Sequence, residues 1–125
     1  MISADASSLI AYFNGVIAPD TDAIAKALSD QDLWLAPAVI VELLGTASNE
    51  AAYDEMVNSA PLLPLNSDYW IRAREMRRLI CAKGLKARAM DTLIAQCCID
   101  ADVPLIARDT DFRHFANWCG LKLVL

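Results

Sequence analysis

The sequence predicts an α/β fold: a three-layer sandwich in which helices cover both faces of a mainly parallel central sheet of four to five strands. Short apolar runs alternate with helical stretches along the chain, an order typical of parallel sheets. The chain has 125 residues, of which 56% are hydrophobic, enough for a well-filled core. Acidic residues follow the first and fourth strand candidates, where open parallel sheets bind ligands. We expect residues 1–125 to form a single domain.

The first part of the chain is predicted to hold one strand and two helices. Residues 1–4 form a short strand candidate that ends at Asp5. A helical pattern follows from Ser7 to about Asn14, and a second helix is predicted from Asp20 to Asp30, where apolar residues recur at helical spacing. This order, strand then helices, begins the alternation that the fold class requires.

The next elements are a short strand and two consecutive helices. Residues 33–36 are a strand candidate that Pro37 stops. Proline is favoured in the first turn of a helix, where its missing N–H is not needed. A helix is therefore predicted over 37–46, closing near Gly45, and a further helix over 48–58.

A short strand and the longest helix come next. Residues 62–63 form a strand candidate with a proline on either side. A helix is predicted over 67–83, because Ser67 is a favoured N-cap and Gly84 a favoured residue just past a helix end.

The last part of the chain returns to the alternation of helix and strand. A helix is predicted over 88–101, followed by a strand over 103–107. A short helix begins at Thr110, and residues 121–124 form the last strand candidate.

Composition limits the location and the partners of the protein. No stretch reaches the roughly 18 apolar residues of a membrane span, and Asp5 comes too early for a signal peptide. We therefore expect a cytoplasmic protein with no membrane partner. The chain is apolar for its size, which favours an exposed hydrophobic surface for a second copy or another protein.

Cysteine and histidine chemistry is not indicated. The four cysteines show no CxxC spacing, and the adjacent Cys97 and Cys98 are a poor disulfide pair. We interpret the cysteines mainly as small buried hydrophobes in a reducing compartment. His114 is the single histidine, so neither a zinc site nor a Ser-His-Asp mechanism has support, and we expect it at the surface.

Basic residues are concentrated in one segment. The net charge of −5 argues against general affinity for nucleic acid. Seven of the eleven basic residues nevertheless fall within residues 72–88, where we expect any anion to bind. A solvated helix face is the alternative for Arg72 and Arg74.

Carboxylates follow two of the predicted strands. Asp5 comes directly after the first strand, and Asp109 and Asp111 come after the strand over 103–107. Capping offers a structural alternative, since Asp is a favoured N-cap and both Asp5 and Asp109 precede helices. One residue can do both.

Two further acids lie in apolar surroundings. Glu42 interrupts the otherwise apolar run AVIVELL, where a lone carboxylate would need a partner unless it lies on an exposed helix face. Asp91 occupies the first turn of a predicted helix, where it would also favour the helix dipole. If these acids converge, they repel one another unless a cation shares the site. The hard ions Mg²⁺ and Mn²⁺ suit oxygen ligands and a phosphate substrate.

Three stretches carry a resemblance to a known family. SADASSLIAYF, PAVIVELLG and ARAMDTLIAQCCIDADVPLIARDTDF resemble the PIN-domain nucleases, and among them the VapC-type toxins of bacterial type II toxin–antitoxin modules. The last stretch is the most specific, with an Asp on a helix, then a strand, then RDxDF. The resemblance covers nearly the whole chain.

The resemblance implies a set of site residues. The quartet that would hold Mg²⁺ or Mn²⁺ and act in catalysis is Asp5, Glu42, Asp91 and Asp109. Asp111 would be an auxiliary metal-binding acid, and Ser7 would support the site. The chain departs from the family pattern at Ala6 and Ala107, where a hydroxyl residue is common.

The resemblance also implies a function. It is that of an endoribonuclease, which hydrolyses RNA phosphodiester bonds with a divalent metal ion, and which forms a homodimer inhibited by a cognate antitoxin protein. Phosphate contacts mainly position a nucleic acid. The residues expected to make them are Lys83, Lys86, Arg88 and Arg108.

Three alternatives stay open. A receiver-like regulatory module also gathers acids at strand ends, but it would want an acidic pair after the first strand, where Asp5 stands alone. A non-catalytic module that binds RNA or protein is the second alternative. A DNA-directed PIN nuclease is the third.

Overall fold

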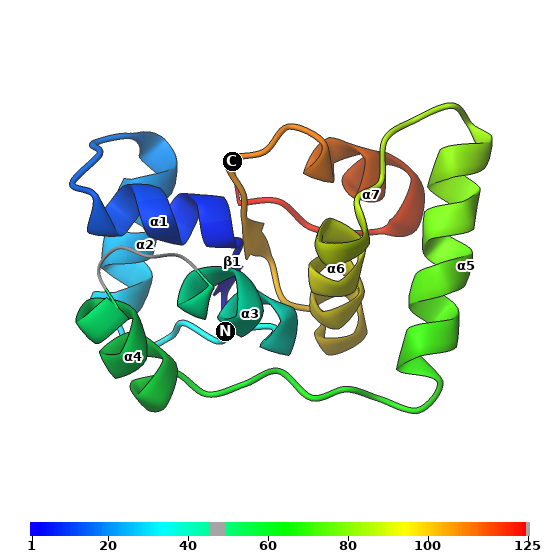
Figure 1. Ribbon diagram of the computed structural model, residues 1–125. Helices are drawn as coiled ribbons and strands as arrows, with labels where there is room; N and C mark the ends of the chain where they lie inside the picture. The colour runs from blue at the N-terminus through cyan, green and yellow to red at the C-terminus, as the bar shows by residue number, and fades with distance from the viewer. Residues whose placement is uncertain (46–49, 125) are drawn as a thin grey trace.

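The computed structural model describes residues 1–45 and 50–124. Seven helices and two strands are found in this part of the chain (Figure 1). The helices are α1 (Ala6–Phe13), α2 (Pro19–Ser29), α3 (Pro37–Leu44), α4 (Glu50–Ser59), α5 (Tyr69–Ala82), α6 (Ala89–Ala101) and α7 (Phe112–Cys119). The strands are β1 (Ser3–Ala4) and β2 (Leu105–Ile106).

The sheet is smaller than the sequence predicts. β1 and β2 pair in parallel, with Ser3 opposite Leu105. The segments predicted as further strands join through single parallel bridges, which are Ile2 to Leu33, Leu35 to Leu62, and Leu105 to Leu123. In the described residues a sheet of four to five strands is therefore not confirmed, and the structure is mostly helical.

Proline explains part of this shortfall. Leu35 receives a hydrogen bond from the Leu63 amide and donates one to the Pro61 carbonyl. The next bond of this parallel pairing would run from residue 37 to the Leu63 carbonyl, but Pro37 has no N–H to donate and already begins α3. Each of these segments consequently contributes a bridge rather than a ladder.

The helix ends confirm several predictions and correct one. Asp5 is the N-cap of α1, Pro37 is the first residue of α3, and Gly84 follows α5 with φ +75°. Ser67, however, is not the cap of α5, since the helix begins at Tyr69 after Asp68, whose φ is 61°. The Ser67 carbonyl instead accepts hydrogen bonds from Arg72.

Two helix predictions extend beyond what the structure describes. Residue 46 of the predicted helix 37–46 and residues 48 and 49 of the predicted helix 48–58 lie outside the described residues. Residues 37–44 of the first stretch and 50–58 of the second are helical, and Gly45 is the C-cap of α3.

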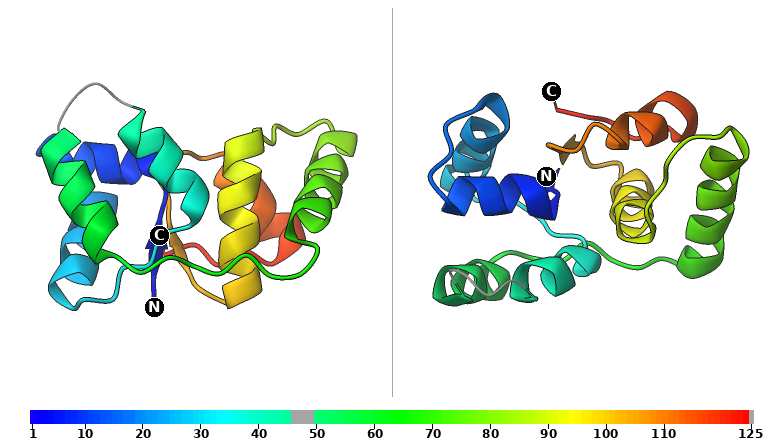
Figure 2. Two further views of the ribbon diagram at one scale, coloured as in Figure 1. Left: turned by 60° about the horizontal axis from the view of Figure 1, so that its bottom comes forward. Right: turned by 45° about the horizontal axis from the view of Figure 1, so that its top comes forward.

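The helices pack around the short sheet in two groups. α1 to α4 lie to one side, while α5, α6 and α7 lie to the other, and α6 stands between α5 and the sheet (Figures 1 and 2). The core side chains at the centre have almost no exposed surface, and they include Leu9, Leu35, Ile94, Leu105 and Phe115. This packing holds α3 in contact with both α1 and α6, which positions the site.

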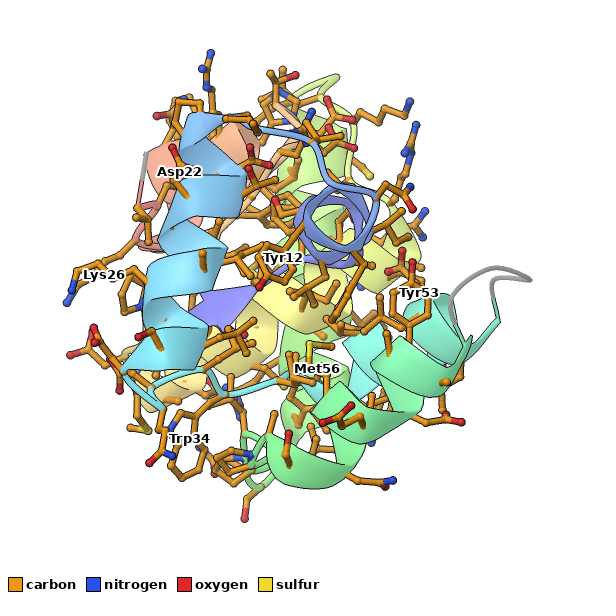
Figure 3. All side chains as sticks on the ribbon, turned by 90° about the vertical axis from the view of Figure 1, so that its left-hand side faces the viewer. Tyr12, Asp22, Lys26, Trp34, Tyr53 and Met56 are labelled. Atoms are coloured by element: carbon orange, nitrogen blue, oxygen red, sulfur yellow. The ribbon has the colours of Figure 1, made fainter. Side chains whose placement is uncertain are left out.

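Buried and exposed side chains of the first group of helices can be compared in a view from its side. Tyr53 and Met56 of α4 are buried, whereas Asp22 and Lys26 of α2 point to solvent (Figure 3). The Tyr53 ring meets Phe13 of α1 edge to face, with ring centroids 5.1 Å apart. In the described part of the chain, no helix is long and apolar enough to cross a membrane.

Candidate active site

A small cavity collects carboxylates from four separate elements. Its volume is about 90 Å³. The lining residues are Asp5, Ala6, Ser7, Glu42, Arg88, Asp91, Ile94 and Asp109. The four acids come from the start of α1, from α3, from the first turn of α6 and from the segment after β2. The structure thus brings the predicted quartet together, and the role of each acid stays a prediction.

Asp5 combines a structural duty with a place in the cavity. One carboxylate oxygen accepts the Ser8 amide at 2.9 Å, which caps α1, and the other accepts the Ser7 hydroxyl at 2.7 Å. The residue is 3% exposed. Both oxygens are therefore held in a fixed orientation by neighbouring groups, and the supporting role of Ser7 in the site stays a prediction.

Glu42 reaches the cavity from the middle of α3. Burial raises the pKa of its carboxyl group, and the negative charge of Asp5 raises it further. Its Oε1 is buried and makes no hydrogen bond within the described structure. A buried carboxylate oxygen without a partner is costly to maintain.

Asp91 is the most strongly perturbed acid of the site. Burial raises the pKa of Asp91 to about 6, and the charges of Asp109, Glu42 and Asp5 add to this effect. The positive charge of Arg88 opposes it. Asp91 Oδ2 is buried and also lacks a hydrogen-bond partner in the described structure. The carboxylates are therefore close enough to act on one another electrostatically.

Asp109 is held by two neighbours. Its Oδ1 accepts the Asp111 amide at 2.9 Å, and its Oδ2 lies 3.5 Å from a guanidinium nitrogen of Arg88. Asp111 contributes this backbone N–H, but its side chain does not line the cavity. The auxiliary acid of the prediction is thus not brought together with the other four.

The donor set fits a hard divalent cation. Such an ion would satisfy two buried carboxylate oxygens that have no partner in the part of the chain that the structure describes, Glu42 Oε1 and Asp91 Oδ2. Within residues 1–45 and 50–124, no three acidic, histidine or cysteine side chains already stand in a ligating arrangement.

The structure places the predicted RNA-binding cations in different settings. Arg88 lines the cavity, and Lys86 is exposed beside it in sequence. The Lys83 ammonium lies over the Trp118 ring, 3.9 Å from its centroid. Arg108 is engaged elsewhere, because its guanidinium donates to both oxygens of Asp20 at 2.9 and 3.0 Å.

Two partners of these residues escaped the sequence analysis. Asp20 is buried at the start of α2 and lies 88 residues from Arg108, so no local pattern indicates the pair. His114 is partly buried, and its Nδ1 lies 2.9 Å from the Lys86 carbonyl oxygen. A carbonyl can only accept, so the ring N–H donates and ties the loop before α6 to α7.

Comparisons with known proteins agree on the fold. The sequence model of the PIN domain family matches residues 2–117. Among solved structures, the chain is similar to a chain in the crystal structure of VapBC2 from Rickettsia felis bound to a DNA fragment from their promoter. The TM-score is 0.73 at 16% sequence identity, over 98% of this chain and 97% of that one. No curated protein sequence matches.

Proposed function

This chain belongs to the PIN domain family, and we propose that it is a divalent-metal-dependent endoribonuclease, the toxin of a toxin–antitoxin pair. The observation that carries the proposal is the convergence of four acids from distant elements on one cavity, where two buried carboxylate oxygens have no partner among residues 1–45 and 50–124. A fold that needed these acids only for stability would pair them.

We assign each acid a role toward the metal ion. Asp5 and Asp91 would hold the ion, Mg²⁺ or Mn²⁺, while Glu42 and Asp109 would complete or shape its site. A bound divalent ion lowers the pKa of a water molecule and offsets the charge that develops on the leaving oxygen. Asp111 would join only after its side chain turns toward the cavity.

The remaining side chains prepare the cavity for a phosphodiester. The Ser7 hydroxyl and the Ser8 amide hold Asp5 in place, so that little reorganisation is needed on binding. Arg88 is 57% exposed at its side chain, and it can turn from Asp109 toward an entering phosphate. Lys86 would add a further phosphate contact at the same mouth.

The partners follow from the same proposal. The similar solved structure is a VapBC2 complex on its promoter DNA, which supports an antitoxin protein as partner for this chain. Exposed apolar side chains such as Val41, Leu44 and Ile71 favour a homodimer or an antitoxin contact. We place the protein in the cytoplasm, where RNA is accessible to it.

A cleavage assay tests the proposed function. Purified protein is incubated with labelled single-stranded RNA and Mn²⁺, with and without a chelator, and in parallel with DNA of the same sequence. We expect cleavage of the RNA alone, and only when the divalent ion is present. Cleavage that survives the chelator would contradict the metal-dependent mechanism, and cleavage of DNA alone would make the chain a DNA-directed nuclease.

Metal binding has a readout that does not depend on activity. A ligand that binds only the folded state at 100 times its Kd stabilises that state by about 2.7 kcal/mol. Mn²⁺ is therefore expected to raise the melting temperature of the wild-type protein, and to raise that of Asp91→Asn much less. An equal rise in both proteins would place the ion outside this cavity.

A further inference from the structure

Charge is distributed very unevenly along this acidic chain. Residues 72–88 contain seven basic residues and one acid, a net charge of +6, in a chain whose total is −5. The rest of the chain therefore carries −11. A basic segment on an acidic protein attracts polyanions to one place and repels them elsewhere.

Three of the seven basic residues of this segment line a groove between α5 and α6. The groove has a volume of about 440 Å³, and its wall combines one aromatic residue, three arginines and small or apolar residues of α6. The residues that matter here are Trp70, Arg74, Arg77, Arg78, Thr92 and Leu93. Trp70 is 64% exposed, an unusual position for so large an apolar side chain.

The arginines of the groove retain positive charge. Arg74 and Arg78 both contact the same Glu75 oxygen, at 3.0 and 3.4 Å, so two guanidinium groups share one carboxylate. Arg77 donates from Nε to the Ala87 carbonyl at 2.7 Å, which orients it beside the loop that leads to α6. Arg72, in contrast, is taken up by Asp100 and does not line the groove.

The groove and the acidic cavity flank the same turn of α6. Thr92 and Leu93 line the groove, whereas Asp91 and Ile94 line the cavity. Arg88, the N-cap of α6, also lines the cavity. In both Figures 1 and 2, α6 stands between α5 and the elements that carry Asp5 and Glu42. The groove and the cavity therefore use consecutive residues at the start of one helix.

We propose that the groove between α5 and α6 binds single-stranded RNA, with a base stacked on Trp70 and phosphates on Arg74 and Arg78, and that the bound strand continues into the acidic cavity. This inference rests on the proposed ribonuclease function and adds a second contact region to it. Aromatic stacking combined with cationic contacts is how single strands are bound without strict sequence preference.

A second copy of the chain suits the groove less well. A two-fold interface places the same surface patch on both partners. A two-fold interface centred on the groove would bring the three groove arginines of one copy close to those of the other. Like charges that face one another weaken association. A polyanion neutralises the same arginines, so charge complementarity favours RNA.

Binding is measured in an Asp91→Asn background, where the RNA is expected to stay intact. The test variant adds Arg74→Ala and Arg78→Ala, and the matched control adds Arg113→Ala, since Arg113 is exposed on α7 and lines neither the groove nor the cavity. We expect the double change to weaken binding of a labelled 12-nucleotide RNA at least tenfold at low salt. The slope of log K against log salt should also fall by about 1.4, which corresponds to two single-strand phosphate contacts. The control should change neither.

Substitution of Trp70 separates stacking from charge. Trp70→Ala should weaken binding by about five- to a hundredfold, the loss expected for one stacked base, while Trp70→Phe should retain most of the affinity. Equal affinities for Trp70→Ala, the arginine variant and the Arg113→Ala control would overturn the proposal.

Failure of this proposal is distinguishable from failure of the nuclease. If no RNA is cleaved by the protein with an intact Asp91, but the groove variants still lose RNA affinity, the groove proposal stands and the nuclease assignment is wrong. If RNA is cleaved and the groove variants bind normally, the groove proposal is wrong. A change of molecular mass in light scattering with unchanged RNA affinity would assign the groove to a second copy instead.

Discussion

Asp91 and Asp100 lie on the same helix, α6, and the structure treats their carboxyl groups in opposite ways. Asp100, near the end of the helix, accepts hydrogen bonds from both terminal nitrogens of Arg72 and from Gln96. The Arg72 guanidinium lowers the pKa of Asp100. Asp91, in the first turn, has a buried Oδ2 with no partner in the described structure, and burial raises its pKa to about 6.

The difference shows which charges the fold requires and which it tolerates. A buried carboxylate that serves stability is neutralised by a dedicated cation, as Asp100 is by Arg72 and Asp20 by Arg108. A buried carboxylate left without a partner reduces stability, and such groups concentrate at functional sites. Asp91 and Glu42 are half-buried, and in the described structure each has one buried carboxylate oxygen of the second kind.

The largest expected effect is on catalysis, from a change of Asp91 in the first turn of α6. Asp91→Asn should reduce RNA cleavage at least a hundredfold, because it removes a charge that would hold the metal ion while it preserves the shape of the side chain. Cleavage rates with Mn²⁺ measure the loss. Asp54→Asn, an exposed acid on α4, is the control that should cleave normally. Full activity of Asp91→Asn would show that the assigned role is wrong.

The next effect is on stability, from loss of the Arg72–Asp100 ion pair near the end of α6. Arg72→Ala leaves the Asp100 carboxylate, 8% exposed, without its cation, which should lower the free energy of unfolding by about 1–2 kcal/mol. Thermal or urea unfolding measures this loss. Arg74→Ala removes only a contact between exposed groups and should stay within about 0.5 kcal/mol of the wild type. Equal losses in the two variants would refute the distinction between them.

A smaller effect of opposite sign is expected from Asp91→Asn on unfolding. In the absence of divalent ions, this change should stabilise the fold by only about 1 kcal/mol at pH 7, because it removes a half-buried charge that lies among like charges and is partly screened by water. A carboxyl whose folded pKa is raised costs the fold stability as the pH rises from about 4 to about 6, since the folded state then binds the proton more tightly than the unfolded state.

Unfolding measured at a series of pH values tests whether the Asp91 charge destabilises the fold. The difference in stability between Asp91→Asn and the wild type should grow between about pH 4 and 6 and stay level above. Asp100, with its lowered pKa, acts in the other direction: its contribution is present above about pH 4 and is lost as the pH falls through its folded pKa. A difference that shrinks with rising pH would contradict the raised pKa of Asp91.

The smallest effect concerns the cation at the mouth of the cavity. Arg88→Ala should raise the pKa of Asp91 above about 6, because the positive charge of Arg88 lowers it in the wild type. The shift should be modest, since the Arg88 side chain is 57% exposed and its charge is screened by water. Carbon-detected NMR titration of the Asp91 carboxyl group measures it, and Arg88→Lys should restore the lower value.

Local sequence rules predicted the parts of the fold that depend on neighbouring residues. Pro37 starts α3, Gly84 follows α5 in a left-handed conformation, and Asp5 caps α1 through the Ser8 amide. The same rules misplaced the start of α5 at Ser67. Asp68 adopts a left-handed conformation, and the Ser67 carbonyl accepts a hydrogen bond from the Arg72 side chain. The extended sheet was not confirmed, since its outer segments pair through single bridges.

By itself, the sequence was enough to single out the four acids that meet in the cavity and the elements on which they lie. It also determined the family to which the chain belongs. Only the tertiary structure decided which charges are paired. Arg72 and Asp100 are 28 residues apart, and Arg108 and Asp20 are 88 apart, whereas periodic patterns along a helix relate residues only three or four positions apart. An ion pair depends on the distance between two groups after folding, so the arginines that neutralise a carboxylate and those left free for an anion look alike in the sequence.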